Sequence, residues 1–267
     1  MLTLKAFNLI ANDLSNIPIF QEAFDLIVTY RLDSEVYRGY GSFINTKKKM
    51  YYHDEEFHKY YVDNKNVSLT KYGITELSNR KKDIAWMVSH CITHSKREDY
   101  VNEMKKFKYL HIDIYGKCGN LSQPSREKGW MPAYKMLAEQ YKFYLSFENA
   151  KCTEYITEKF FSALYSGMIP VAMGGMSRKD YEKIAPPHSF IHVDDFSSPD
   201  HLMKFLYRLS KDTNQYNSYY WWKSYYDIGV YGFKNEVKCQ LCDVLNSNEK
   251  IVSQKYENFS AYWDVCR

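Results

Sequence analysis

Along most of this chain, short apolar runs alternate with longer stretches that have a helical pattern. The short runs predict strands and the longer stretches predict helices. After residue 83 the alternation becomes regular. We expect strands at 83–89, 109–114, 142–147, 168–173 and 189–193, and helices near 95–106, 132–141, 157–166, 199–211 and 213–226. Helices that alternate with strands in this way indicate βαβ units and an α/β fold with a parallel sheet, whose ligand lies at the carboxyl ends of the strands.

The N-terminal part of the chain follows a different pattern. Residues 24–30 form an apolar run that predicts a buried strand, whereas residues 44–82 are rich in Lys, Tyr and Asn and lack a clear period. We interpret 44–82 as a long polar excursion between a small N-terminal part and the main domain. The predicted organisation is a partial domain over 1–82, a main domain over 83–246 and a C-terminal tail over 247–267.

The composition is that of a folded protein with a large core. The chain has 267 residues, of which 45% are hydrophobic and 17% are aromatic, and this excludes a disordered chain. Its 26 tyrosines are typical of amphipathic surfaces that contact sugars or other proteins. The net charge of +4 comes with only short, separated basic runs, so we expect no nucleic-acid partner.

Cysteines and sequons favour, to a modest degree, the lumen of the secretory pathway. No run of about 18 apolar residues predicts a membrane span. The six cysteines are at positions 91, 118, 152, 239, 242 and 266, and the N-x-S sequons are at Asn66, Asn120 and Asn258. We expect the Cys239-x-x-Cys242 pair to form a local disulfide rather than half of a zinc site, because no second pair has similar spacing.

Several kinds of chemistry lack their motif. The chain has no G-x-S-x-G, H-E-x-x-H, P-loop or G-x-G-x-x-G sequence, which argues against hydrolase, zinc-protease, ATPase and dinucleotide-binding functions. The acidic and histidine-containing cluster at 53–58 could hold a metal, but we interpret it as a solvated run of charge.

The most informative segment is 143–161, in which an apolar strand runs into an acidic loop and then a helix. The loop and the helix start gather polar side chains at one corner: Glu148, Asn149, Tyr155, Thr157, Glu158 and Lys159. A helix start after a strand is where α/β folds bind phosphate. Taken singly, Glu158 would be a capping acid, Lys159 a solvent lysine, Tyr155 a core-edge aromatic and Arg97 part of a charged helix face.

Three segments resemble the donor-binding domain of the alpha-1,3-fucosyltransferase family: FYLSFENAKCTEYITEKFF (143–161), SGMIPVAMGG (166–175) and HSFIHVDDFSSPDHL (188–202). FDLIVTYRLDSEV (24–36), Arg97, YGKCGN (115–120) and CQLC (239–242) also resemble this family. The cysteines in the YGKC and ENAKC segments are more similar to members that modify the N-glycan core. Within 24–36, the residues Tyr30, Arg31, Asp33 and Ser34 match the family pattern without a role that we can assign.

The resemblance implies an inverting transfer of L-fucose from GDP-fucose to a GlcNAc hydroxyl of a glycan. The implied architecture is GT-B, a Rossmann-like donor domain plus a second domain for the acceptor, here incomplete. Glu158, Lys159 and Arg97 are then the catalytic candidates, and the donor-binding candidates are Glu148, Asn149, Tyr155, Thr157, Arg97 and Lys159. Glu148 is expected to orient its neighbours. No metal is expected, even at Asp194 and Asp195, since Lys and Arg side chains neutralise the phosphates.

One departure concerns the general base. The family carries a Glu-Ser-Pro triplet ahead of the strand at 24–30, and only Asp13 and Glu22 precede that strand here, without the triplet. The chain therefore resembles an N-terminally truncated form, and the full-length protein is expected to be anchored in the Golgi membrane with a lumenal catalytic domain. Two alternatives remain: a catalytically impaired fragment that binds nucleotide or glycan as a partner of an active relative, and a transferase for another nucleotide sugar.

Overall fold

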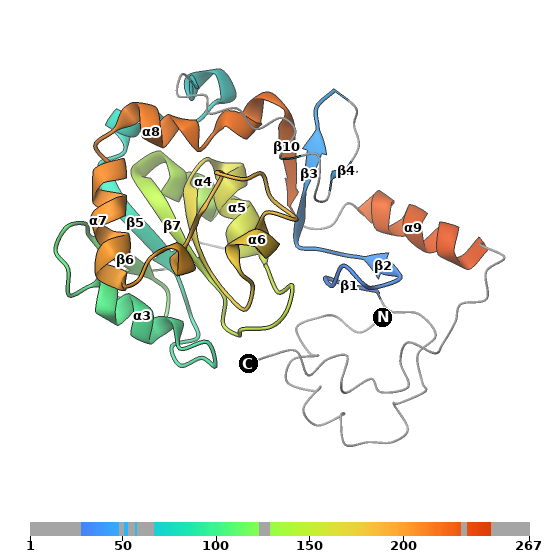
Figure 1. The fold of residues 1–267 in the computed structure, drawn as a ribbon, viewed down its shortest axis with the longest axis horizontal. Helices are drawn as coiled ribbons and strands as arrows, with labels where there is room; N and C mark the ends of the chain where they lie inside the picture. Colours follow the sequence, from blue (N-terminus) through green and yellow to red (C-terminus); the bar gives the residue numbers. More distant parts are fainter. Residues whose placement is uncertain are drawn as a thin grey trace.

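A five-stranded parallel sheet is the framework of the fold (Figure 1). The computed structural model describes residues 28–47, 51–52, 57, 67–122, 129–230 and 234–246. The strand order is β6-β5-β7-β8-β9, with bounds Lys82–Met87 for β5, Ile112–Tyr115 for β6, Tyr141–Phe147 for β7, Ile169–Met173 for β8 and Ile191–His192 for β9. Every neighbouring pair in this sheet is parallel. The predicted α/β fold with a parallel sheet is confirmed.

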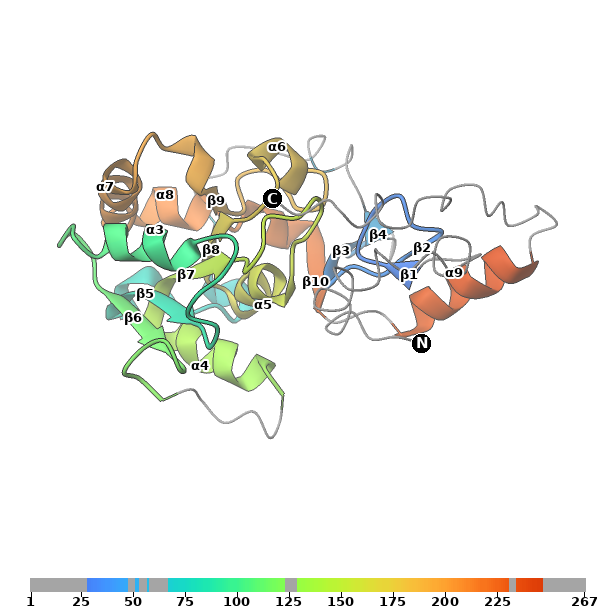
Figure 2. The same cartoon turned by 90° about the horizontal axis from the view of Figure 1, so that it is seen from below.

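Helices cover both faces of the sheet. Their bounds are α3 Arg97–Met104, α4 Met131–Gln140, α5 Glu158–Ser166, α6 Arg178–Tyr181, α7 Pro199–Leu209 and α8 Thr213–Ser218. The helices α3 and α7 pack against each other, and so do α4 and α5. Figure 2 shows α3 and α7 on one side of the strands and α4 on the other. No helix in the described ranges is long and apolar enough to cross a bilayer.

The central strands β5 and β7 are buried on both faces, as parallel strands covered by helices must be. In β5, Trp86 belongs to the core cluster that contains α3 and α7, whereas its neighbours Ala85 and Met87 belong to the cluster that contains α4. In β7, Phe143 and Tyr144 divide in the same way. Side chains that alternate between two cores make the register of these strands sensitive to a shift of one residue.

The N-terminal part contributes two small sheets. The strands β1 (Val28–Thr29) and β2 (Val36–Tyr37) are parallel, and β3 (Gly41–Asn45) lies antiparallel between β4 (Tyr51–Tyr52) and β10 (Tyr226–Val230). Residue 41 lies so close to α5 that a Cβ atom would be 2.3 Å from Phe161 Cγ, and only glycine fits there. The helix α9 (Lys234–Asn246) packs against β2. Early and late parts of the chain thus meet beside the parallel sheet.

The structure corrects three predictions about elements. The predicted helix at 213–226 is wrong beyond Ser218, because the chain continues as a 3₁₀ turn at Trp221–Ser224 and then as β10. Here the buried ring of Trp222 packs on Phe43, a distant residue, and the pairing of β10 with β3 overrides the local pattern. On α5, the helical pattern of 157–166 puts Tyr165 on one apolar face with Phe160, Phe161 and Leu164, but Tyr165 is 42% exposed.

The third correction concerns the segment 44–82, only part of which is described. The 3₁₀ turns at Thr70–Tyr72 and Leu77–Asn79 give it local order, and its apolar side chains at Val67, Leu69 and Ile74 are buried in the main core. Residues 67–82 are therefore not a solvated linker. The domain boundaries at 82 and 246 stay predictions, and the predicted strand at 24–30 is described only from residue 28.

Candidate active site

The carboxyl ends of β5 and β7 meet where the strand order reverses, since the chain leaves β5 toward β6 on one side and returns to β7 on the other. Doubly wound sheets bind ligands in the crevice outside this point. The loop at 88–96 and the loop at 148–157, which we call the β7–α5 loop, lie together here. Ser95 joins them, with its N–H donating to Asn149 O at 3.3 Å and its hydroxyl donating to Glu148 O at 2.7 Å.

A buried carboxylate organises the start of α5. Glu148 is fully buried and accepts hydrogen bonds from the Thr157 N–H at 2.8 Å, from the Thr157 hydroxyl at 2.9 Å and from Lys159 Nζ at 2.8 Å. Lys159 Nζ also donates to Thr157 Oγ1 at 2.6 Å. Because a buried charge is tolerated only when it is paired and hydrogen-bonded, this network fixes the position of the lysine.

Lys159 retains its charge in this setting. Burial alone would lower the pKa of its ammonium group, but the carboxylates of Glu148 and Glu158 outweigh that effect and raise the pKa above its ordinary value. The Lys159 side chain is 18% exposed, and Glu158 Oε1 lies 3.8 Å from its Nζ. The first N–H groups of an α-helix have no acceptor within the helix, so the start of α5 adds backbone donors beside this cation.

Arg97 lies behind the junction of the two loops. It is 3% exposed, its Nη1 donates to Phe147 O at 2.6 Å and its Nη2 donates to His90 O at 3.4 Å. The guanidinium carbon lies 5.7 Å from the Trp86 ring. Burial lowers the pKa of this arginine, while Glu148 and Glu98 oppose the shift. The described bonds are to backbone carbonyls, so Arg97 holds the two loops together, and its Nε is buried without a partner among the described residues.

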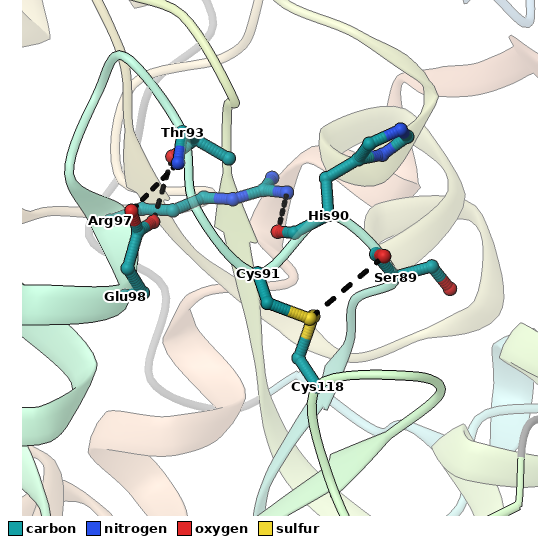
Figure 3. The surroundings of a disulfide bond; sticks show 7 residues. All are labelled: Ser89, His90, Cys91, Thr93, Arg97, Glu98 and Cys118. Atoms are coloured by element: carbon teal, nitrogen blue, oxygen red, sulfur yellow. Dashed lines mark hydrogen bonds between the residues drawn. A yellow bond between two sulfur atoms is a disulfide. The ribbon is translucent and has the colours of Figure 1, made fainter.

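The loop at 88–96, which we call the β5 loop, is tied by a disulfide to a later part of the chain, as Figure 3 shows. Cys91 is bonded to Cys118, 27 residues later in the chain. On the other side of the loop, Glu98 accepts hydrogen bonds from the Thr93 N–H at 2.7 Å and from the Thr93 hydroxyl at 2.8 Å. His90, whose carbonyl accepts a hydrogen bond from Arg97, thus lies in a loop that is fixed by the disulfide on one side and by the hydrogen bonds to Glu98 on the other.

Three tyrosines pack together beside the start of α5. The ring of Tyr155 lies 5.3 Å from that of Tyr30 and 6.2 Å from that of Tyr40. Burial, together with the negative charges of Glu148 and Glu158, raises the pKa of Tyr155, so its hydroxyl stays neutral. These rings form an aromatic wall next to the charged cluster.

A fixed lysine at the start of a helix suits an anionic ligand. Comparison with known proteins identifies the family to which the chain belongs. The family model described as "Glycosyltransferase family 10 (fucosyltransferase) C-term" matches residues 77–262. The chain belongs to this family of fucosyltransferases. The resemblance stated from the sequence is confirmed.

The sequences of relatives in this family align with most of this chain. Glycoprotein 3-alpha-L-fucosyltransferase A of Drosophila melanogaster is 36% identical over 247 residues, which are 91% of this chain and 43% of that protein. Alpha-(1,3)-fucosyltransferase C of the same organism is 34% identical over 92% of this chain and 56% of that protein. The chain thus spans about half the length of these fucosyltransferases. A crystal structure of an alpha1,3-fucosyltransferase with GDP-fucose covers 65% of this chain at 20% identity, with a TM-score of 0.49.

The fucosyltransferase fold brings the predicted site residues to one corner. Glu148, Thr157, Glu158 and Lys159 form one charged cluster, and Arg97 reaches it through the backbone of residue 147. Asn149 is half-buried, and its Oδ1 is buried without a partner among the described residues. The structure places each of these residues, whereas their contact with a donor substrate stays a prediction.

Two further predictions concerned metals and thiols. Among the described residues, no group of three or more His, Cys, Asp or Glu side chains could hold a metal ion. The cluster at 53–58 lies outside the described residues, apart from residue 57. The predicted disulfide between Cys239 and Cys242 is wrong, because both are free, exposed thiols on α9. Cys152 in the β7–α5 loop is disulfide-bonded.

Four further residues support this site and were not predicted from the sequence. Thr93, Glu98, Tyr40 and Glu154 each support the loops that carry the predicted residues. Of these, only Glu98 had a local signal: Ser95 precedes it by three positions, which is the spacing of a capping box. The structure instead begins α3 after Lys96, without a side-chain cap, and turns Glu98 toward Thr93.

Proposed function

We propose that this chain is the donor-binding part of an alpha-1,3-fucosyltransferase, which moves L-fucose from GDP-fucose to a GlcNAc hydroxyl of a glycoprotein glycan with inversion. The observation that carries the proposal is Lys159, a charged lysine held at the start of α5 by the buried carboxylate of Glu148. The cluster lies at the carboxyl edge of a Rossmann-like parallel sheet. A GT-B arrangement, with an acceptor domain only partly contained in this chain, is part of the proposal.

The chemistry follows from where charge develops. When the bond between fucose and the diphosphate breaks, negative charge grows on the departing GDP. Donors that are fixed beforehand stabilise this charge more than the ground state, because they need no reorganisation. Lys159 supplies one fixed cation, and the backbone N–H groups at the helix start supply further donors. Arg97 anchors the carbonyls behind them, and contact of its buried guanidinium group with a phosphate oxygen stays a prediction.

Glu158 lies on the same helix turn as Lys159, and it matches a family residue that is expected close to the fucose. Its carboxylate can accept hydrogen bonds from sugar hydroxyl groups, or stabilise positive charge on the sugar ring as the bond to phosphate breaks. Tyr155 and Asn149 would bound the donor, the first through its ring and the second through its free amide oxygen. The base that deprotonates the acceptor hydroxyl lies outside this proposal.

Two measurements test the proposed function. GDP at a concentration of 100 Kd should stabilise the folded protein by about 2.7 kcal/mol, which appears as a shift of the thermal unfolding midpoint. Fucose transfer to a GlcNAc-terminated acceptor should follow, with GDP-fucose preferred over other nucleotide sugars. A folded protein without a GDP-dependent shift would contradict donor binding. Binding without turnover would instead favour the alternative, a nucleotide- or glycan-binding partner of an active relative.

The cellular location of the full-length protein is also a proposal. We infer that the full-length protein is anchored in the Golgi membrane with this part in the lumen. The Cys91–Cys118 disulfide supports an oxidising compartment, and the sequon residue Asn120 is exposed. Asn66 and Asn258 lie outside the described residues. Similarity to a Drosophila fucosyltransferase named for glycoproteins supports a glycoprotein acceptor. Localisation of the tagged full-length protein to the cytosol would contradict the lumenal setting.

A further inference from the structure

The turn at residues 29–34 matches the family pattern, and its Tyr30 contributes to the aromatic wall beside α5. Ser34 N–H donates to Arg31 O at 3.2 Å and closes the turn. Thr29 Oγ1 accepts from the Arg31 N–H at 3.0 Å and is hydrogen-bonded to the Ser34 hydroxyl at 2.7 Å. The Arg31 guanidinium makes two bonds to the Asp33 carboxylate, at 2.9 and 2.7 Å. These polar groups stiffen the turn from within.

One backbone group of this turn reaches the β7–α5 loop. The Leu32 N–H donates to Glu154 Oε2 at 2.8 Å, across 122 residues of sequence. Next to this bond, the buried ring of Tyr30 packs against Tyr155. Two consecutive loop residues therefore contact two residues of the turn, a few positions before Lys159.

The backbone of Glu154 adds an independent observation. Its φ is +58°, in the left-handed region that a side chain disfavours and glycine adopts freely. Its N–H is directed at Met176 Sδ at 2.8 Å. A residue that bears a carboxylate where the backbone favours glycine points to a task for the side chain, and the bond to Leu32 is that task.

Leu32 of the turn packs against the same hydrophobic cluster that contains Ile156 of the loop. A hollow lies beside their contact, lined in part by Tyr30, Leu32, Glu154 and Met176. At the edge of this hollow, the hydrogen bond of Glu154 and the contact of the Tyr30 ring with Tyr155 add to the apolar packing. Loss of either should release the β7–α5 loop without collapse of the parallel sheet.

We propose that the 29–34 turn is a clamp that holds the β7–α5 loop through Glu154, which is thus a positioning residue for Thr157 and Lys159. The clamp sets the loop so that the start of α5 faces the donor diphosphate. Its effect on fucose transfer rests on the proposed function, whereas the clamp itself is a property of the fold.

The first experiment measures the clamp without activity. Leu32 is the second residue of the turn closed by Ser34, a position that favours proline, so L32P removes the donating N–H and also replaces the leucine side chain. Hydrogen exchange of peptides within 148–160 should accelerate about tenfold in L32P and in E154A, because a hydrogen bond to a charged group is lost. The double variant should exchange no faster than the singles, since both remove the same bond.

The controls separate this bond from general destabilisation. L32A keeps the N–H but loses the side chain that packs on the core, so it is the reference for L32P. E139A removes an exposed carboxylate on α4 and should exchange like the wild type. E154G removes the carboxylate but relieves the left-handed backbone. If E154G keeps wild-type exchange in the loop, or if the effects of L32P and E154A add, the clamp is refuted.

The second experiment measures positioning in the enzyme. E154A and L32P should raise the KM for GDP-fucose about tenfold and leave the KM for the acceptor unchanged. E154Q, whose amide oxygen can still accept from Leu32, should recover most of the donor affinity. Equal losses for both substrates would contradict a positioning role. A wild-type protein that fails to bind GDP would overturn the proposed function, while the exchange data would still decide the clamp.

Discussion

At the scale of single residues, the site depends on a lysine that keeps its positive charge although two carboxylates lie beside it. Glu148 and Glu158 raise the pKa of Lys159, and the hydrogen bonds of Glu148 hold its ammonium group at the start of α5. A flexible lysine would lose side-chain freedom each time it met a phosphate. Here that entropy is lost on folding, so the cation is already placed when the donor arrives.

Replacement of Lys159 tests this arrangement directly. K159A should lower kcat for fucose transfer by about 100-fold, the usual effect of removing one preorganised partner of a developing negative charge. It should also destabilise the fold by about 3 kcal/mol, because Glu148 is left buried and unpaired. Steady-state kinetics and urea unfolding measure the two effects.

A double variant separates the effect on activity from the effect on stability. E148Q/K159A leaves no unpaired charge and should regain much of the stability while activity stays low. The control is K179A, which removes an exposed lysine of α6 and should change neither quantity. Normal kcat in folded K159A would contradict the role of this lysine.

At the scale of elements, the loops after β5 and β7 are each held by several independent links. The β5 loop has the Cys91–Cys118 disulfide and the Thr93–Glu98 hydrogen bonds, and Ser95 connects it to the neighbouring loop. Loops at a strand edge are usually the mobile part of an α/β fold. The number of links here indicates a site that is largely formed before a ligand binds.

Removal of the disulfide tests how much of this order is covalent. C91S/C118S opens a loop with a sequence separation of 27 and should lower the free energy of unfolding by about 3 kcal/mol. Because the carbonyl of His90 then loses one support, Arg97 should hold the loop less firmly and the KM for GDP-fucose should rise. Calorimetry of the oxidised and variant proteins measures the first effect, and an unchanged melting temperature would contradict it.

The carboxylate on the other side of the loop gives a pH dependence. Burial would raise the pKa of Glu98, but the hydrogen bonds donated by Thr93 outweigh it and lower the pKa below its ordinary value of 4.5. The stabilisation from Glu98 is therefore complete above pH 4.5 and is lost as the pH falls through the lowered value. E98Q should flatten this acid limb of the stability curve, and D99N, on the same helix, should not.

The sequence predicted the elements with a strong local signal and failed where distant residues decide. The helix at 157–166 and the strands around it are found within one or two residues, because apolar period, a polar start and Gly167 all agree. The strand β10 was missed, since the aromatic residues ahead of it also suit a helix and only pairing with β3 selects the strand. The bond between Leu32 and Glu154 had no local signal at all.

At the scale of the whole molecule, charge balance shapes how the site attracts its donor. The net charge is +4, but within the cluster the two cations, Arg97 and Lys159, face two carboxylates, Glu148 and Glu158. The site thus has no large positive field. Attraction to a diphosphate must come from short-range hydrogen bonds at the helix start, and these act only after the ligand has lost water.

This balance leads to a prediction about metal ions and salt. The proposed chemistry uses side-chain cations and helix N–H groups to stabilise the departing diphosphate, so GDP-fucose turnover should persist after treatment with EDTA. Because long-range attraction is weak, raising the salt concentration from about 0.05 to 0.5 M should change the donor KM less than threefold, whereas a site with a strong positive field would lose far more affinity. Loss of turnover in EDTA, restored by a divalent cation, would show that the carboxylates of the cluster serve a metal, and Lys159 would then no longer be the principal charge opposite the diphosphate.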